Sequence, residues 1–236
     1  MMIVLSCSYL PDEEGTLYEP KTETGDYAIY YSGSIQPENA FIMIPGGLVD
    51  PYAYACWIRD LVREDSSFAV VLMKYPSNLA IANIGKVKKI MDELAGFTHW
   101  AVGGHSLGGV VAATTLDDNR ELFDGLVLMA SWSREAADLS DWEGTVLSIY
   151  ASEDSLATEE EVQENSNFLP AGVQIDSPNI IPDGDRRTYY YRIAGGNHSG
   201  FGCYGLQDGD GTPWITSEAQ QELMITVMKS YFESLW

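Results

Sequence analysis

The chain has 236 residues, of which 45% are hydrophobic and 20% are charged. This composition is typical of an ordinary globular protein and excludes a disordered chain, and the length suffices to bury a large core. The 13 basic and 35 acidic residues give a formal net charge of −22. A surface with this charge repels nucleic acid and anionic lipid, so we expect neither as a partner.

The first eight residues, MMIVLSCS, are apolar but too few to span a membrane. They lack a basic stretch, so they do not form a complete signal peptide. Val4-Leu5-Ser6-Cys7 loosely resembles a bacterial lipoprotein cleavage box. We therefore treat residues 1–26 as an N-terminal segment, which is an edge strand, a frayed end or a trimmed export signal. Two locations fit the sequence: the cytoplasm, or export with a lipid anchor on Cys7.

Short apolar runs alternate with helical patterns over residues 27–236, which predicts one domain of the α/β class. We expect a mostly parallel sheet of about seven or eight strands that is flanked by helices. The predicted strands cover residues 27–31, 41–44, 68–73, 100–103, 126–130, 146–150 and 189–193. The connection over residues 131–143 is too short for a large cap domain, and residues 170–187 form a surface excursion or small flap.

The last predicted helix carries a buried stripe of apolar residues that ends near the C-terminus. Ser217 is followed three residues later by Gln220, which is the pattern of a capping box. We therefore expect Ser217 to cap this helix.

Gly104-His105-Ser106-Leu107-Gly108 follows a predicted buried strand and precedes a helix of small residues. The G-x-S-x-G motif requires this strand–turn–helix context. The turn is tight and strained, and small residues around the serine let the strand and the helix approach each other. We therefore predict that Ser106 is a nucleophile on a nucleophile elbow, and not a helix-capping serine in a glycine-rich turn.

A serine hydroxyl needs a base, and the chain has three histidines. His99 precedes the strand that ends at Ser106, which puts it roughly 23 Å away at ~3.3 Å per residue. His105 is directed away from its neighbour's hydroxyl by the turn. His198 follows the last predicted strand, at the same edge of the sheet as the serine. His198 is therefore the expected base.

The carboxylate that orients the base is expected after the strand that ends at Tyr150. Asp154 is our first choice and Glu153 is the alternative, although either acid is also a candidate for capping a turn or a helix.

Two backbone N–H groups must converge on one point to stabilise an oxyanion. One is expected from Leu107, the residue after the nucleophile. The other is expected from the loop Pro45-Gly46-Gly47-Leu48-Val49-Asp50-Pro51, where Gly47 is our first choice and Leu48 our second. Apolar residues near the ends of the predicted strands are candidates for substrate binding, although each ring is equally a candidate core residue. These candidates are Leu48, Trp132, Phe201 and Tyr204.

The three cysteines, Cys7, Cys56 and Cys203, are too few for a disulfide scaffold. A bridge between Cys56 and Cys203 remains an open alternative. The sequence has no CxxC pair and no His/Cys spacing that suits a metal, so we expect no metal site.

Together the elbow, the segment Ile44–Pro51 and the segment Gly196-Asn197-His198-Ser199-Gly200-Phe201-Gly202 resemble the α/β hydrolases. The resemblance is to the compact, capless group called α/β-hydrolase family 5, and it extends from about Tyr27. It implies the α/β-hydrolase fold, in which the nucleophile, acid and base follow the order Ser106, Asp154, His198. It also implies acyl hydrolysis without a metal or an organic cofactor. Many family members have His-Gly where this chain has Pro45-Gly46, which bears on the oxyanion donor and not on the serine.

We therefore predict a serine hydrolase that cleaves carboxylic esters, or related acyl substrates, through an acyl-enzyme on Ser106. Its expected partner is a small-molecule substrate, and the sequence does not indicate its oligomeric state. A thioesterase, a peptidase or an acyltransferase would use the same three residues. A haloperoxidase-like side activity is a weaker alternative. A binding module that retains the fold without catalysis is the alternative from another class, and a broken triad would mark it.

Overall fold

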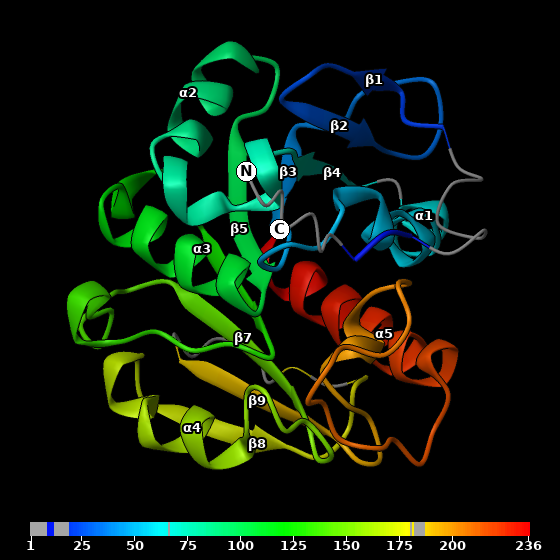
Figure 1. Ribbon diagram of the computed structural model, residues 1–236. Helices are drawn as coiled ribbons and strands as arrows, with labels where there is room; N and C mark the ends of the chain where they lie inside the picture. Colours follow the sequence, from blue (N-terminus) through cyan, green and yellow to red (C-terminus); the bar gives the residue numbers. More distant parts are fainter. Residues whose placement is uncertain (1–8, 12–18, 66, 180, 182–186) are drawn as a thin grey trace, which may run out of the picture.

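The computed structural model describes residues 9–11, 19–65, 67–179, 181 and 187–236 (Figure 1). The predicted lipid anchor at Cys7 lies outside these residues.

A mostly parallel sheet forms the centre of the molecule, as the sequence predicts (Figure 1). In the described residues it has nine strands in the order β1-β2-β4-β3-β5-β6-β7-β9-β8. The pairs β1–β2 and β2–β4 are antiparallel, and the other neighbours are parallel. The strands are β1 (Thr22–Glu23), β2 (Tyr27–Tyr30), β3 (Asn39–Ile44), β4 (Phe68–Met73), β5 (His99–His105), β6 (Gly125–Met129), β7 (Thr145–Ala151), β8 (Gly172–Ile175) and β9 (Thr188–Ile193).

Helices cover both faces of this sheet. The α-helices are α1 (Ala55–Glu64), α2 (Lys86–Glu93), α3 (Leu107–Asp117), α4 (Glu159–Glu164) and α5 (Ser217–Leu235). Short 3-10 helices are η1 (Pro51–Tyr54), η2 (Pro76–Asn78), η3 (Ala80–Asn83), η4 (Arg120–Leu122), η5 (Glu135–Ala137), η6 (Ser166–Phe168) and η7 (Ser199–Phe201). Between β6 and β7 the structure has only η5, in agreement with the expected lack of a large cap.

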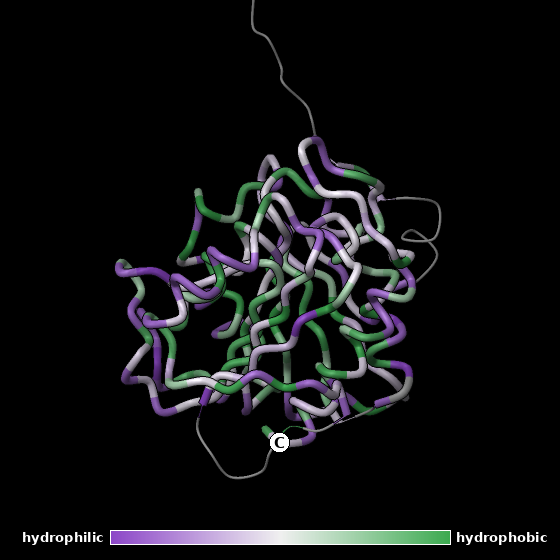
Figure 2. Tube along the Cα trace, turned by 90° about the horizontal axis from the view of Figure 1, so that it is seen from below, coloured by the Kyte–Doolittle hydropathy of each residue, from purple (hydrophilic) through white to green (hydrophobic). Residues whose placement is uncertain are grey.

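Two apolar cores lie on opposite faces of the sheet. Because side chains alternate along a strand, Phe41 and Met43 of β3 pack with α1 and α5, whereas Ile42 and Ile44 pack with α2 and α3. In Figure 2 the hydrophobic segments accordingly run through the interior, and the hydrophilic segments lie at the periphery. A strand buried on both faces reads as a continuous apolar run, which is why the central strands could be predicted.

The parallel strands place their C-terminal ends along one edge of the sheet. Loops that follow β3, β5, β6, β7 and β9 therefore lie at this edge, which is where ligands bind in α/β sheets. Each candidate site residue is located in, or next to, one of these loops.

Candidate active site

Ser106 lies in the turn between β5 and α3, where its backbone has φ 54° and ψ −125°. A residue other than glycine adopts positive φ only under strain. Its N–H donates to the carbonyl oxygen of Met129 at 2.9 Å, and its carbonyl oxygen accepts from Ser131 Oγ at 2.8 Å. These bonds to the end of β6 hold the strained turn and leave Ser106 partly exposed.

Gly104 of the motif allows β5 and α3 to approach each other, and Gly108 allows α3 to approach the end of β3. A Cβ atom added to Gly104 would lie 2.3 Å from the carbonyl carbon of Gly108. One added to Gly108 would lie 2.3 Å from the carbonyl oxygen of Ile44. Both distances are far below van der Waals contact, so only glycine fits at either position.

His198 lies in the loop after β9, and its ring meets the carboxylate of Asp154 in the loop after β7. The distance from His198 Nδ1 to Asp154 Oδ2 is 2.8 Å, and the two side chains are 2% and 0% exposed. Because the carboxylate accepts, the proton of the neutral ring is on Nδ1, and Nε2 remains an acceptor. Asp154 Oδ1 accepts from the N–H groups of Leu156 and Ala157 at 2.8 and 2.7 Å, which fixes the carboxylate.

The alternative acid and the other candidate base lie elsewhere. The Glu153 carboxylate accepts from Ser152 Oγ at 2.8 Å. His99 is exposed at the start of β5, where its Nδ1 is 3.3 Å from Asp124 Oδ2. The structure therefore brings Asp154, and not Glu153, to His198.

The ring of His105 packs against the ring of His198. The sequence did not predict this contact. The centroids of the two rings are 4.5 Å apart, and the ring of Phe201 stacks on His105 at 5.5 Å. Burial, together with the nearby ring of His198, holds the pKa of His105 well below its usual value, so this side chain is neutral. The hydroxyl of Tyr54 lies 2.9 Å from His105 Nδ1 and accepts from the N–H of Gly46 at 2.9 Å.

Asp210 holds the backbone around His198. Its Oδ1 accepts from the N–H groups of His198 at 3.2 Å and Gly211 at 2.8 Å. Its Oδ2 accepts from the N–H and the Oγ of Ser199 at 2.8 and 2.7 Å. No motif in the sequence marks this residue, because its role depends on a turn that only the folded loop brings back to His198.

Gln220 holds the same loop from the first turn of α5. Its Oε1 accepts from the N–H of Asn197 at 2.9 Å, and its Nε2 donates to the Asn197 carbonyl oxygen at 2.8 Å. The predicted capping box of Ser217 and Gln220 is therefore wrong. The residue that caps α5 is Thr216, whose hydroxyl accepts from the N–H of Ala219 at 3.2 Å.

The loop after β3 brings its second glycine to the elbow. A Cβ atom added to Gly47 would lie 3.0 Å from Leu107 Cδ2, so the side chain of Leu107 packs against Gly47. Within the described residues, the N–H groups of Gly47 and Leu107 have no hydrogen-bond acceptor. The N–H of Leu48 donates to the carbonyl oxygen of Asn78 at 2.8 Å. Of the two loop candidates, only Gly47 therefore retains an available donor.

A cavity of about 210 Å³ opens beside Ser106. Its lining includes Ser106, Leu107, Val110, Trp132, Leu156 and Ala157. The other substrate-binding candidates lie outside this lining: Phe201 is fully buried against His105, the buried Tyr204 packs at 5.6 Å from the ring of Tyr9, and Leu48 is 39% exposed on its loop.

The described part of the chain contains no group of three or more His, Cys, Asp or Glu side chains arranged to hold a metal ion. None of its helices combines the length and the apolar character that crossing a membrane requires.

Residues 40–222 match the model of the Alpha/beta hydrolase family. No curated protein gives a significant sequence match.

Several solved structures share the fold. An esterase from Thermogutta terrifontis, with malate bound, has a TM-score of 0.60 at 10% identity, over 92% of this chain and 97% of that one. MGS-MChE2, an alpha/beta hydrolase enzyme from a sediment metagenome of the Mar Chica lagoon in Morocco, has a TM-score of 0.61 at 13% identity, over 90% and 97%. Est1E from Butyrivibrio proteoclasticus has a TM-score of 0.58 at 12% identity, over 88% and 94%. At these identities the likeness shows the fold alone.

Proposed function

This chain belongs to the alpha/beta hydrolase family, and on that premise we propose that it is a serine hydrolase that cleaves carboxylic esters through an acyl-enzyme on Ser106. The observation that carries the proposal is the buried bond between His198 and Asp154. Leu156 and Ala157, whose N–H groups bind that carboxylate, line the same cavity as Ser106. These contacts put the loop that holds Asp154 beside Ser106, and they support the proposal that the serine and the imidazole act together.

In the proposed reaction His198 Nε2 takes the proton of Ser106 Oγ as that oxygen attacks the carbonyl carbon of the ester. Asp154 keeps Nδ1–H oriented and stabilises the imidazolium that forms. The N–H groups of Gly47 and Leu107 bind the oxyanion of the tetrahedral intermediate. His198 then gives its proton to the leaving alcohol, and the acyl group remains on Ser106. A water molecule that loses its proton to His198 hydrolyses this acyl-enzyme and restores the serine.

The first test is labelling and mutation. We expect a fluorophosphonate to label Ser106, and we expect Ser106→Ala and His198→Ala each to lower kcat for a p-nitrophenyl ester at least about a thousandfold. Asp154→Asn should be strongly impaired as well, and the combined variants should be little worse than the single ones, because the three residues act as a unit. Glu153→Gln is the matched control on the neighbouring acid. Full activity in Ser106→Ala, or a loss in Glu153→Gln alone, would contradict the assignment.

The second test separates the reaction classes that the same residues serve. Rates on a matched ester, thioester and peptide panel, and on an ester in the presence of a competing alcohol, distinguish an esterase from a thioesterase, a peptidase and an acyltransferase. We expect the ester to be the best substrate. A folded protein that neither turns over any member of the panel nor reacts with the fluorophosphonate would be a binding module instead.

A further inference from the structure

The cavity beside Ser106 has walls from three parts of the fold. The first turn of α3 contributes Leu107 and Val110, and the segment after β6 contributes Trp132. Leu156 and Ala157 come from the loop that also holds Asp154. The cavity is therefore built on the same elements that fix the proposed nucleophile and its acid.

We infer that this cavity binds the acyl part of the substrate, and that it takes a short, uncharged acyl group. This inference rests on the proposed function. None of the described residues that line the cavity is charged. Its second hydroxyl, that of Ser131, already donates to the carbonyl oxygen of Ser106 at 2.8 Å. A carboxylate or ammonium group placed there would lose its hydration without gaining a partner, so the lining favours hydrocarbon.

The position of the base assigns the cavity to the acyl group and not to the alcohol. The leaving oxygen must lie beside His198, because that ring gives it a proton. His198 packs against His105, which in turn stacks on Phe201, and none of these three rings lines the cavity. The cavity therefore lies away from the leaving-group side of Ser106, where the acyl chain of a bound ester would extend.

The volume sets a limit on the length of that chain. The space of about 210 Å³ is smaller than the roughly 300–1,000 Å³ of pockets that take drug-sized ligands. We therefore expect it to take acyl groups up to about hexanoyl, and each methylene group buried there should raise kcat/KM roughly fourfold. Carbons beyond this limit extend into solvent and bring no further gain.

The experiment measures kcat/KM for p-nitrophenyl esters from acetate to dodecanoate, and for hexanoate and decanoate chains that end in a carboxylate. We expect a rise to about hexanoate, no further rise from octanoate onward, and at least a tenfold loss for the hexanoate chain with the terminal carboxylate. A parallel series of butanoate esters with alcohols of increasing length should vary less than threefold. A rise that continues to dodecanoate, or a dependence on the alcohol alone, would overturn the inference.

Two variants alter the cavity in opposite directions. Val110→Phe fills it, so the hexanoate-to-acetate ratio of kcat/KM should fall at least tenfold. Trp132→Ala enlarges it, so the decanoate-to-hexanoate ratio should rise at least fivefold. Ile35→Phe and Trp214→Ala are matched controls, because these side chains are 83% and 78% exposed and do not line the cavity.

Thermal unfolding shows whether each cavity variant folds. If one does not fold, the other alone tests the inference. Unchanged ratios in a folded variant whose Ser106 still reacts with a fluorophosphonate would overturn the acyl-cavity inference and leave the proposed function standing. A wild-type protein that neither hydrolyses any ester nor labels at Ser106 would overturn both.

Discussion

The hydroxyl of Tyr54 connects two parts of the site that are far apart in the sequence. It accepts from the N–H of Gly46 and lies 2.9 Å from Nδ1 of His105. A hydroxyl has one proton and two acceptor sites, so the same oxygen can accept from Gly46 and also bond to the ring of His105. Burial raises the pKa of Tyr54, and burial lowers that of His105, so both groups are neutral. These neutral groups link the loop after β3 to the residue before Ser106.

Tyr54→Phe removes this link and keeps the packing of the ring. We expect kcat to fall about tenfold and KM to stay within twofold, because the N–H of Gly47, next to Gly46, would lose its alignment in the transition state. The free energy of unfolding should fall by about 1–3 kcal/mol, the effect of leaving a buried N–H without its acceptor.

Steady-state kinetics and urea unfolding measure the two effects. The control is Tyr52→Phe, because Tyr52 lies two residues away and its hydroxyl bonds to Lys74 and Glu23 outside the site. Equal kcat values for Tyr54→Phe and Tyr52→Phe would contradict the role of the link.

The sequence predicts best those residue positions that follow from order along the chain. Ser106 and His198 follow the ends of strands, and chain order with the parallel topology places both at one edge. The geometry of Asp154 agrees with its first-choice prediction as well. The contacts of Tyr54 and Asp210 were not predictable, because they join side chains to backbone atoms whose proximity arises only from tertiary packing.

At the scale of elements, the loop that carries His198 is held by helix α5 and by Asp210, a later residue of the same loop. The first turn of α5 binds Asn197 through Gln220, and Asp210 binds His198, Ser199 and Gly211. A loop is ordinarily more mobile than the strands that it joins, so these bonds supply the rigidity that an aligned base requires.

Asp210→Asn keeps the size of the side chain and replaces one acceptor oxygen with a donor. At least one of the N–H groups that Asp210 binds would then face an amide nitrogen, so the loop should shift. We expect kcat to fall about tenfold and the free energy of unfolding to fall by about 1–3 kcal/mol. Asp208→Asn is the matched control, because Asp208 is exposed and only two residues away. A loss of stability with kcat unchanged would mean that Asp210 supports the fold and not the position of His198.

Helices and strands were predictable where their burial requires a regular pattern of apolar residues in the sequence. The buried central strands were found from their apolar runs, whereas β1, with two exposed residues, and the edge strand β8, which begins at Gly172, carry no such run. The predicted surface excursion over residues 170–187 contains β8. The prediction that Ser217 caps α5 was wrong because a glutamine at position 220 suits either a capping box or a tertiary contact. Only the fold shows that Gln220 makes the tertiary contact, with Asn197.

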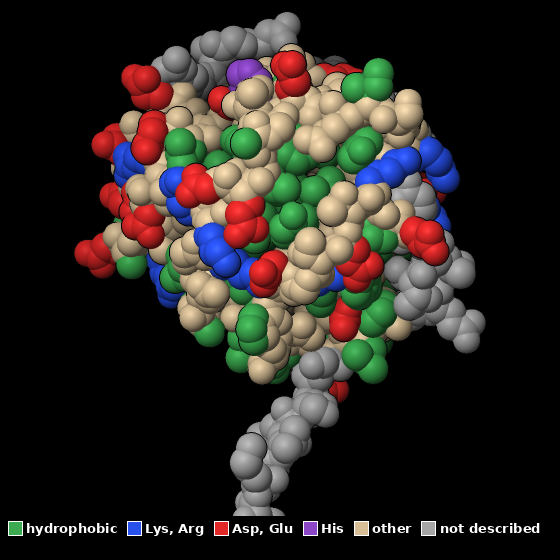
Figure 3. Space-filling model, turned by 90° about the horizontal axis from the view of Figure 1, so that it is seen from above, with side chains coloured by type: hydrophobic (Ala, Val, Ile, Leu, Met, Phe, Trp, Pro, Cys, Tyr) green, Lys and Arg blue, Asp and Glu red, His purple; other side chains and the backbone are tan. Residues whose placement is uncertain are grey.

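At the scale of the whole molecule, 35 acidic residues outnumber 13 basic ones. On the face drawn in Figure 3, acidic side chains are dispersed, and Lys and Arg side chains lie among them. Charges of this kind act mainly on solubility and on the approach of ions, and salt screens them. They therefore say little about which residues form the site.

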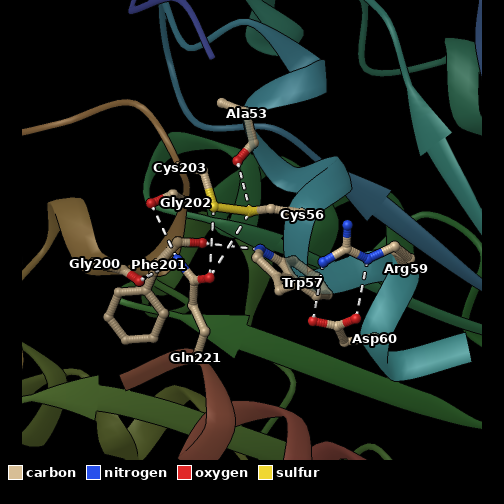
Figure 4. The surroundings of a disulfide bond; sticks show 10 residues. All are labelled: Ala53, Cys56, Trp57, Arg59, Asp60, Gly200, Phe201, Gly202, Cys203 and Gln221. Atoms are coloured by element: carbon tan, nitrogen blue, oxygen red, sulfur yellow. Dashed lines mark hydrogen bonds and ion pairs between the residues drawn. A yellow bond between two sulfur atoms is a disulfide. The ribbon is translucent and has the colours of Figure 1, made fainter. Parts of the chain in front are cut away.

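A disulfide bond between Cys56 and Cys203 joins α1 to the segment that follows His198 (Figure 4). Hydrogen bonds surround it: the N–H of Cys203 donates to the Ala53 carbonyl oxygen at 2.7 Å, and Gln221 Nε2 donates to the carbonyl oxygens of Gly200 and Gly202, each at 3.2 Å. The sequence left this pairing open, because the two cysteines are 147 residues apart and only the fold brings α1 to this loop.

The bond should stabilise the folded protein strongly. Closing a loop of 147 residues restricts the unfolded chain by roughly 5 kcal/mol in the chain-entropy treatment, and measured values usually fall to about 2–4 kcal/mol. We therefore expect a reducing dithiol to lower the free energy of unfolding in urea by about 2–5 kcal/mol. The double variant Cys56→Ala/Cys203→Ala should show the same loss and should not respond to the dithiol. Its kcat should fall less than tenfold at temperatures where it stays folded, since Asp210, Gln220 and Gln221 still hold the loop.

Alkylation followed by mass spectrometry provides the matching chemical measurement: two more thiols should react after reduction than before it. Disulfides persist in oxidising compartments, so in freshly opened source cells the bond should be intact if the chain is exported and reduced if it resides in the cytoplasm. A wild-type protein whose unfolding is indifferent to the dithiol, although both cysteines become alkylated, would show that the bond does not support the fold. The position of His198 would then depend on the hydrogen bonds of Asp154, Asp210, Gln220 and Gln221 and not on the disulfide.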